Sequence, residues 1–216
     1  DKDLFLNEHG DADPVLSRDS ALSVGVPGTV AGLALALEKY GTITLKEALK
    51  PAIYLAKNGI LMTQDLHDSL NRAKEKMKQY PDTMRIFFKQ DGSSYQVGER
   101  LIQKDLAKSL SLIAKNGSKA FYDGDISKKI LKDFKENDGI FIKEDFLNYE
   151  IRKLEPLCGT YKSYKVCSMP PPSSGGVAII QMLNILENFE VKNFSHSSLE
   201  YIYLLKNIMG FAKYLS

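Results

Sequence analysis

Hydrophobic residues recur at helical spacing through most of the chain. In the segment 104–116, Leu106, Leu110 and Ile113 fall at i, i+4 and i+7 and predict an amphipathic helix. A second amphipathic helix is predicted around 126–134, with apolar residues on one side and lysines elsewhere on its surface: Ile126, Ile130, Phe134, Lys128, Lys129 and Lys132. Such helices typically cover a core with one face and meet solvent with the other.

The turn-rich segment 1–18 is expected to be irregular or to form a short hairpin. After it, the sequence predicts a helix with small residues on one face. From Val30 to Leu37 the chain is almost entirely apolar, and Gly28, Gly32 and Ala36 recur at every fourth position. Small residues on one helix face allow another backbone to approach closely. We therefore expect this helix to be buried.

Several helix ends are also marked in the sequence. Thr44 and Glu47 have the spacing of a capping box, which predicts a helix start. Pro51 has no backbone N–H, so we expect it to kink or restart that helix. The sequence Ala-Lys-Asn-Gly occurs at 56–59 and again at 114–117, and each glycine predicts a C-cap. We interpret this as one capping solution used twice, because the core positions do not match as they would in a true repeat.

The pattern changes after Pro156, where two short runs rich in Tyr, Thr and Val flank the dipeptide Lys162-Ser163 and predict a β-hairpin. If the dipeptide forms a two-residue turn, Cys158 lies opposite Cys167 in a non-hydrogen-bonded pair, with both side chains on the same face. Two interpretations stay open for these cysteines. They form a disulfide in an oxidising compartment, or they are two independent buried thiols.

The last part of the chain predicts two very apolar helices. Residues 177–189 are apolar nearly all round and predict a core helix, and residues 199–215 are unusually hydrophobic for a surface helix. The pattern stops abruptly at Ser216, so we expect a truncated end whose apolar surface awaits a missing partner segment. The chain opens with Asp1-Lys2-Asp3 instead of a signal peptide, and we expect this start to be cut as well.

Composition narrows the class of protein. Of the 216 residues, 44% are hydrophobic, which is ordinary for a globular protein. The 29 Lys and Arg against 27 Asp and Glu give a net charge of +2, and the basic residues are spread along the chain, so no nucleic-acid partner is expected. The sequence has no run of about 18 apolar residues, so no transmembrane helix is expected.

Residues that could bind a metal or a dinucleotide are few. His9, His67 and His196 lie in polar contexts with no partner at metal-ligand spacing, which argues against a zinc hydrolase. The glycine-rich run 25–32 lacks the order of a dinucleotide-binding loop, so we expect its glycines to serve packing.

The stretch 170–176, Pro-Pro-Pro-Ser-Ser-Gly-Gly, is the most unusual in the chain. Three prolines stiffen it, and its hydroxyls and amides lie just before a predicted helix. They could bind an anion there, or cap the helix through Ser173 or Ser174. Neither serine has a base nearby that would make it a nucleophile, so we favour the capping interpretation.

Six segments, taken in order along the chain, resemble the gamma-glutamyltranspeptidase family, whose members are also called glutathione hydrolases. They are Gly25 to Leu33, Pro51-Ala52-Ile53 with Ala56 to Gly59, Ala120-Phe121-Tyr122, Asp145-Phe146-x-x-Tyr149, Gly159-Thr160-Tyr161, and Pro170 to Gly176. The resemblance extends over nearly the whole chain, to about Phe189, and the two glycine-containing signatures together are specific.

The resemblance implies an α+β fold: a mostly helical fragment with a β-hairpin, which in the complete protein is part of the αββα sandwich of an N-terminal-nucleophile hydrolase. The chain would be a single partial domain, 1–216, internal to the large subunit. Its helical region would cover about 25–150, and the hairpin and core helices about 151–216. Members of this family are made as proenzymes that cut themselves into a large and a small subunit.

The implied activity is cleavage of the γ-glutamyl amide of glutathione and transfer of the γ-glutamyl group to water, amino acids or peptides. The nucleophile is the threonine that starts the small subunit, whose own α-amine is suited to act as base. In this family, an Arg that holds the substrate carboxylate lies upstream of the segment that this chain resembles. We therefore expect no catalytic, cofactor-binding or metal-binding residue in this chain, no cofactor, and no activity of the fragment alone. Its expected partner is the small subunit of the same precursor, and glutathione and other γ-glutamyl compounds are the expected substrates of the complete enzyme.

Two alternatives to this function stay open. An acylase acting on another amide, such as a cephalosporin side chain, would share the fold and the nucleophile. A non-catalytic remnant that serves as a scaffold or interaction module would fit the missing nucleophile and the apolar end of the chain.

One departure from the family pattern lies near the end, where Ala212-Lys213-Tyr214-Leu215 stands in place of the Ala-Asp-Arg run that relatives tend to have. It lowers the expectation that the parent protein is active.

The family is usually exported, so the resemblance also implies a periplasmic, secreted or cell-surface location.

Overall fold

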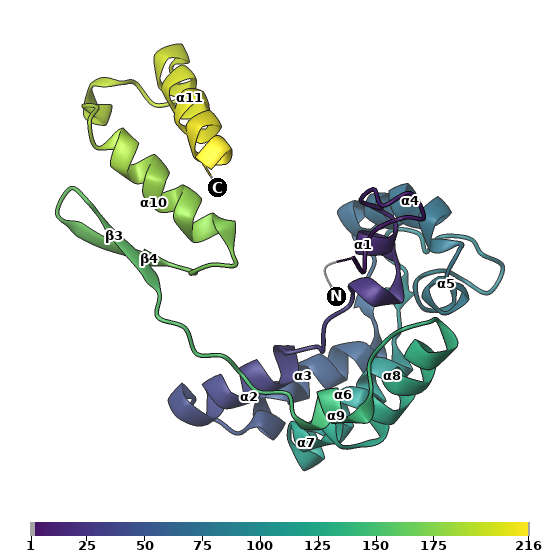
Figure 1. The fold of residues 1–216 in the computed structure, drawn as a ribbon. Coiled ribbons are helices and arrows are strands. Elements are labelled where there is room, and N and C mark those ends of the chain that lie inside the picture. Colours follow the sequence, from purple (N-terminus) through teal and green to yellow (C-terminus); the bar gives the residue numbers. More distant parts are fainter. Residues whose placement is uncertain (1–2, 216) are drawn as a thin grey trace. The chain divides into compact units, whose positions relative to one another are not determined.

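The computed structural model describes residues 3–215, of which 213–215 are described by their backbone alone. The chain forms two compact units, Asp1–Ile151 and Arg152–Ser216 (Figure 1). In the described part of the chain, every helix is too short or too polar to cross a membrane. The family departure at 213–215 concerns side chains outside the described residues.

The first unit consists of helices and one two-stranded sheet. Its elements are α1 (Leu16–Asp19), the 3-10 helix η1 (Ala21–Ser23), α2 (Thr29–Tyr40), α3 (Leu45–Asn58), β1 (Ile60–Leu61), α4 (Gln64–Met77), α5 (Pro81–Phe87), β2 (Arg100–Leu101), α6 (Lys104–Asn116), α7 (Lys119–Tyr122), α8 (Asp125–Glu136) and α9 (Lys143–Leu147).

Helix α3 begins at the predicted capping box. The Thr44 hydroxyl accepts a hydrogen bond from the Glu47 N–H at 3.2 Å, and the Glu47 carboxylate accepts one from the Thr44 N–H at 2.9 Å. The helix continues through Pro51 to Asn58, so a restart at the proline is excluded, and the alternative of a kink there stays a prediction. Proline removes one hydrogen bond of the helix, and the packing of α3 along α6 holds the two halves together. The C-cap glycines Gly59 and Gly117 adopt φ of 86° and 70°, in agreement with their prediction.

A small core follows α3 in the sequence. Strand β1 pairs with β2 in antiparallel register, and the residues between them carry α4 and α5. Met62, Leu70, Phe88 and Leu101 are at most 8% exposed and form the centre of this core.

Helix α2 is not buried, contrary to the prediction from its small residues. All of its residues are described, none is buried, and Leu33 is 64% exposed. A Cβ added at Gly28 would lie 2.1 Å from Tyr149 Oη, whereas one added at Gly32 would meet nothing within 4 Å. Of the two glycines on this face, Gly28 is therefore the one that a neighbour approaches closely, and Gly32 is not.

The amphipathic helices α6 and α8 mostly follow their predicted patterns. In α8 the predicted apolar side is half-buried and the three lysines are exposed. In α6, Ile113 is buried and Leu110 is half-buried, but Leu106 is 45% exposed and Ala107 takes the buried position beside it. The helix is rotated by about one residue from the expected face, because α3 approaches closely over an alanine.

The second unit is a β-hairpin with two long helices. Its elements are β3 (Leu157–Tyr161), β4 (Tyr164–Ser168), α10 (Ser174–Leu186), the 3-10 helix η2 (Val191–Asn193) and α11 (Leu199–Leu215). Figure 1 shows the hairpin on one side of α10 and α11 on the other.

The hairpin has the predicted register, with Tyr161 paired to Tyr164 and Cys158 paired to Cys167. The two cysteines form a disulfide, with their Cα atoms 4.1 Å apart, so the interpretation as independent buried thiols is wrong. Both cysteines are exposed on the face of the hairpin opposite Gly159, which contacts α10.

Helix α10 is less enclosed than a core helix. Gly176 is its buried residue, and the apolar residues from Val177 onward are half-buried or exposed. Helix α11 has the predicted bounds and buries Ile208 and Ala212, while five of its large apolar residues are more than half exposed: Leu199, Ile202, Tyr203, Met209 and Phe211. Much of the apolar surface of this unit is therefore uncovered within residues 152–212.

Candidate functional site

Three of the family-like segments meet at one place in the first unit. The Tyr122 hydroxyl donates a hydrogen bond to the Pro27 carbonyl at 2.6 Å and accepts one from the Ala31 N–H at 3.2 Å. The Tyr149 ring stacks on Tyr122, with ring centroids 5.4 Å apart and planes at 3°. We call Pro27, Gly28, Tyr122 and Tyr149 the tyrosine clasp.

Gly28 is required in the tyrosine clasp because Tyr149 Oη occupies the space where a Cβ would lie. Burial raises the pKa of Tyr122, opposed by the hydrogen bond from Ala31 N–H. The Tyr122 hydroxyl is therefore neutral at physiological pH. It donates one hydrogen bond to a backbone carbonyl and accepts one from a backbone N–H. This arrangement fixes the loop before α2, and the hydroxyl proton is engaged by the Pro27 carbonyl.

Another family-like segment forms the turn 170–176, which leads into the start of α10. The Ser173 N–H donates to the Pro170 carbonyl at 3.2 Å, and a Cβ added at Gly176 would lie 2.0 Å from the carbonyl oxygen of Met169. Only a residue without a side chain allows the turn to fold back this tightly. Gly176 is thus the position that closes the turn onto the end of the hairpin.

Ser173 occupies the N-cap position of α10, but its side chain makes no capping hydrogen bond, and Ser174 is the first helical residue. The predicted cap through a serine hydroxyl is therefore wrong at the N-cap. Residues 173–175 are exposed, so water can satisfy the free N–H groups of the first turn. In the part of the chain that the structure describes, neither serine is hydrogen-bonded to a basic side chain that could activate it as a nucleophile.

The hairpin is held against α10 at two points. A Cβ added at Gly159 would lie 2.7 Å from Cγ2 of Ile180, so the glycine lets the strand lie directly on the helix. At the turn, the Lys162 N–H donates to the Glu187 carboxylate at the end of α10. The family-like segment 159–161 therefore supports the helix that carries the turn 170–176.

None of the three histidines belongs to the tyrosine clasp or to the turn 170–176. His67 lies on α4, with Nδ1 2.8 Å from the Tyr95 carbonyl oxygen, and His9 and His196 are exposed. Over residues 3–215, no group of three or more His, Cys, Asp and Glu side chains is arranged to hold a metal ion.

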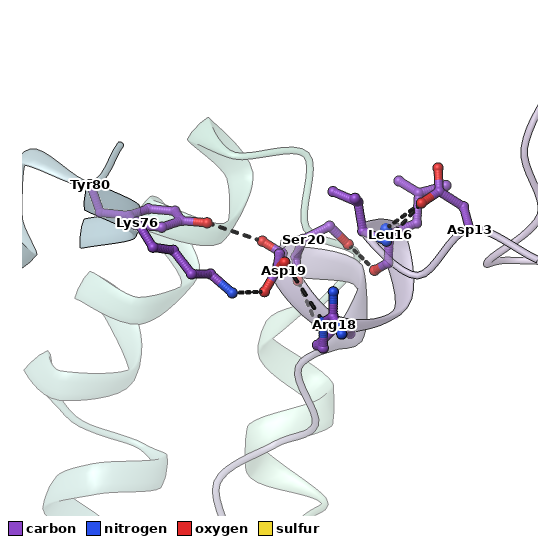
Figure 2. Close-up of polar contacts among 9 residues, drawn as sticks. Asp13, Leu16, Arg18, Asp19, Ser20, Lys76 and Tyr80 are labelled. Atoms are coloured by element: carbon purple, nitrogen blue, oxygen red, sulfur yellow. Dashed lines mark hydrogen bonds and ion pairs between the residues drawn. The ribbon is translucent and has the colours of Figure 1, made fainter. Parts of the chain in front are cut away.

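A further polar cluster, which no sequence pattern predicted, fixes the N-terminal segment to α4 (Figure 2). The Asp19 carboxylate accepts a hydrogen bond from Lys76 Nζ at 2.5 Å, and Tyr80 Oη donates to the Asp19 carbonyl at 3.4 Å. The hydrogen bond from Lys76 lowers the pKa of Asp19, with smaller help from the charges of Lys76 and Arg18. The Arg18 side chain is 71% exposed and its Nε lies 3.8 Å from the same carboxylate. The cluster connects α1 to α4.

Known proteins resemble this chain along almost all of its length. The sequence profile described as gamma-glutamyltranspeptidase matches residues 1–214. The glutathione hydrolase proenzyme of Escherichia coli (strain K12) is 40% identical over 212 residues, which cover 98% of this chain and 36% of that protein. The crystal structure of Helicobacter pylori gamma-glutamyltranspeptidase is 41% identical, with a TM-score of 0.91, and the match covers 99% of this chain and 61% of that chain.

A relative with a different name is also similar. The acylase ACY 1 proenzyme of Pseudomonas sp. (strain SE83) is 36% identical over 192 residues, which cover 89% of this chain and 34% of that protein. The chain thus spans about a third of the length of the curated relatives it matches. With a family match over residues 1–214 and three of the family-like segments in contact within the first unit, the chain belongs to the gamma-glutamyltranspeptidase family.

Proposed function

We propose that this chain is a large-subunit segment of a self-processing gamma-glutamyltranspeptidase, which cleaves the γ-glutamyl amide of glutathione and transfers the γ-glutamyl group to water, amino acids or peptides. The tyrosine clasp carries the proposal. Segments 25–33, 120–122 and 145–149 are far apart in the sequence, yet they meet through specific contacts of Tyr122 and Tyr149. The similarity to the Escherichia coli glutathione hydrolase proenzyme supports the same function.

In the proposed mechanism the threonine at the start of the small subunit attacks the γ-glutamyl carbonyl. Its α-amine takes the hydroxyl proton and returns a proton to the leaving amine, so an ester replaces the amide. Water or an acceptor amine then attacks the ester and releases the threonine. Residues of this chain provide framework for that chemistry, within an αββα sandwich shared with the small subunit, and Ser173 and Ser174 take no covalent part.

The test is hydrolysis of a chromogenic γ-glutamyl amide by the complete gene product and by the 216-residue chain in parallel. We expect the complete product to cut itself in two and to turn over the substrate, and the chain alone to be inactive. A variant of the complete product with its processing threonine changed to alanine is the control, because it should lose both self-cleavage and turnover. Turnover by the 216-residue chain alone would contradict the proposal and make Ser173→Ala and Ser174→Ala the next variants to test.

An acylase of the same fold is the second candidate, favoured by the relative named as an acylase. The complete product should then prefer a cephalosporin side-chain amide over a γ-glutamyl amide, as a ratio of kcat/KM values. Failure to self-cleave, together with no turnover of either substrate, would favour the non-catalytic scaffold.

We further propose a periplasmic, secreted or cell-surface location. The exposed disulfide Cys158–Cys167 supports it, since disulfides persist mainly in oxidising compartments. Alkylation of free thiols in intact cells checks this location. Two alkylated cysteines before any reductant is added would count against it.

A further inference from the structure

The disulfide Cys158–Cys167 lies on the face of the hairpin that is turned away from α10. Residues of a strand alternate between its two faces, so Thr160 and Lys165 share this face with the cysteines. All four residues are exposed. The opposite face packs on α10 at Gly159, where a Cβ would lie 2.7 Å from a side chain of the helix. A small molecule in solution therefore reaches the disulfide without displacing α10.

The hairpin keeps its shape by contacts other than this disulfide. Five residue pairs join β3 to β4, and the Lys162 N–H donates a hydrogen bond to the Glu187 carboxylate of α10. The two cysteines are nine residues apart, so the disulfide closes a short loop and restricts the unfolded chain less than a long-range bridge does. Opening the disulfide thus requires no unfolding, and the ladder keeps the two sulfurs near each other afterwards. Exposed disulfides of this kind exchange more readily than buried ones.

Lys165 places a positive charge beside the disulfide. It precedes Cys167 by two residues on β4, about 7 Å along the strand, and its side chain is long enough to bring the ammonium near either sulfur. None of the ion pairs among residues 3–215 includes Lys165. A cation at this position attracts an anionic reactant and stabilises the thiolate that leaves when a disulfide opens.

We propose that Cys158–Cys167 is a thiol-exchange site for small anionic thiols. The thiolate of the reactant attacks one cysteine Sγ, and a bond between these two sulfurs forms as the bond between the two Sγ atoms breaks. The electron pair passes to the other cysteine, which leaves as a thiolate near Lys165 and exchanges a proton with water. A second molecule of the thiol attacks the mixed disulfide. Both cysteines are then reduced, and the two small thiols are oxidised to their own disulfide.

Glutathione is a member of this class of thiols, because it carries more carboxylate than ammonium groups. Its assignment as the natural reactant rests on the proposed function, which brings glutathione to this protein. The exchange site itself rests on the hairpin alone. The two proposals can therefore fail separately.

The test treats the oxidised complete gene product, in buffer without denaturant, with one of two thiols. They are 2-mercaptoethanesulfonate, which is anionic, and 2-mercaptoethanol, which is neutral. Neither thiol has a γ-glutamyl group, so the result does not depend on γ-glutamyl hydrolysis. Samples are quenched with an alkylating reagent, and mass spectrometry measures how much of Cys158 and Cys167 is in the disulfide, the mixed disulfide and the reduced form.

Both thiols should open the disulfide while the far-UV circular dichroism of the protein stays unchanged. Compared per thiolate, the sulfonate should react about threefold faster, which is the effect of two unit charges about 7 Å apart in water. Added salt should reduce this difference, because it screens exposed charges.

Lys165→Gln should bring the ratio of the two rates to about one, because the attracting charge is removed. Lys206→Gln on α11 is the matched control and should keep the threefold ratio. Lys206 is also exposed and is included in none of the ion pairs among residues 3–215. It lies in the same unit, on the helix that packs on the other side of α10 from the hairpin (Figure 1).

Three results would overturn the proposal. A disulfide that opens in urea but not in buffer would be a structural bridge that the complete protein shields. Equal rates per thiolate for the two thiols would show that the site does not select an anion. Equal ratios in the Lys165 and Lys206 variants would show that the charge of Lys165 does not act on the exchange.

Discussion

Replacing Gly176 by alanine should destabilise the second unit through one identifiable contact. The new Cβ would lie 2.0 Å from the carbonyl oxygen of Met169, far inside van der Waals distance. The neighbour is backbone, so it cannot rotate away as the end of a side chain could. Either α10 or the end of β4 has to shift.

The size of the effect can be worked out from two opposing contributions. Overpacking a tight site costs about 1–3 kcal/mol, and a backbone neighbour places the cost in the upper part of that range. Alanine recovers up to about 1 kcal/mol over glycine in a helix. The expected net loss of unfolding free energy is about 1–2 kcal/mol.

Gly175→Ala is a matched control in the same helical turn. Its Cβ would meet only the Ser173 hydroxyl, at 3.7 Å, which is an ordinary contact. This variant gains the same helix propensity without the clash, so it should be neutral or stabilised by up to about 1 kcal/mol. The difference between the two variants should be about 2–3 kcal/mol, a factor of about 30 to 140 in the folding equilibrium.

Urea unfolding followed by far-UV circular dichroism measures this difference, since the chain has no tryptophan to report by fluorescence. Hydrogen exchange of the α10 amides then shows whether the loss is confined to the second unit. Unfolding free energies of the two variants that agree within about 0.5 kcal/mol would refute the reasoning, because the clash would then have relaxed at no cost.

Three further predictions concern the first unit. Tyr122→Phe removes two hydrogen bonds of the tyrosine clasp and should cost about 1–2 kcal/mol in urea unfolding, while Tyr40→Phe, at a residue 85% exposed, should be neutral. Thr44→Ala should cost about 1 kcal/mol through loss of the α3 cap, and Thr44→Ser should restore most of it. Because Lys76 lowers the pKa of Asp19, the contribution of Asp19 to stability is present above its ordinary pKa of 3.8 and is lost as pH falls through the lowered value. Asp19→Asn should therefore be less stable than the wild type at neutral pH and converge with it in acid; a gap that persists well below pH 3.8 would contradict this.

Features set by neighbouring residues could be predicted from the sequence. The two-residue turn at Lys162-Ser163 determined every pair in the hairpin, including Cys158 with Cys167, because strand residues alternate with a period of two. The capping box and the C-cap glycines are equally local, and the structure contains them where they were predicted.

Features that depend on distant residues could not be predicted in the same way. Tyr122 reaches Pro27 across 95 positions, and Lys76 reaches Asp19 across 57, and no periodicity marks such pairs. The burial of α2 was wrongly predicted for a related reason. Small residues permit a close neighbour, but the sequence of α2 does not say whether a neighbour is present, and Tyr149 supplies one at Gly28 only.

The ladder between β1 and β2 has a consequence for how this family can vary. After α3 the chain enters β1 at Ile60 and returns at Leu101 directly opposite, and the Gln103 N–H then donates to the Ala56 carbonyl at 2.9 Å. Residues 62–99 thus leave and rejoin the rest of the unit at a single point, and they form a core together with Leu101 of β2. Insertions or deletions at the exposed turns of this lobe need not separate α3 from α6, so we expect chain length to change most freely there, whereas exchange of the whole lobe would also remove the contacts of Lys76 and Tyr80 with Asp19.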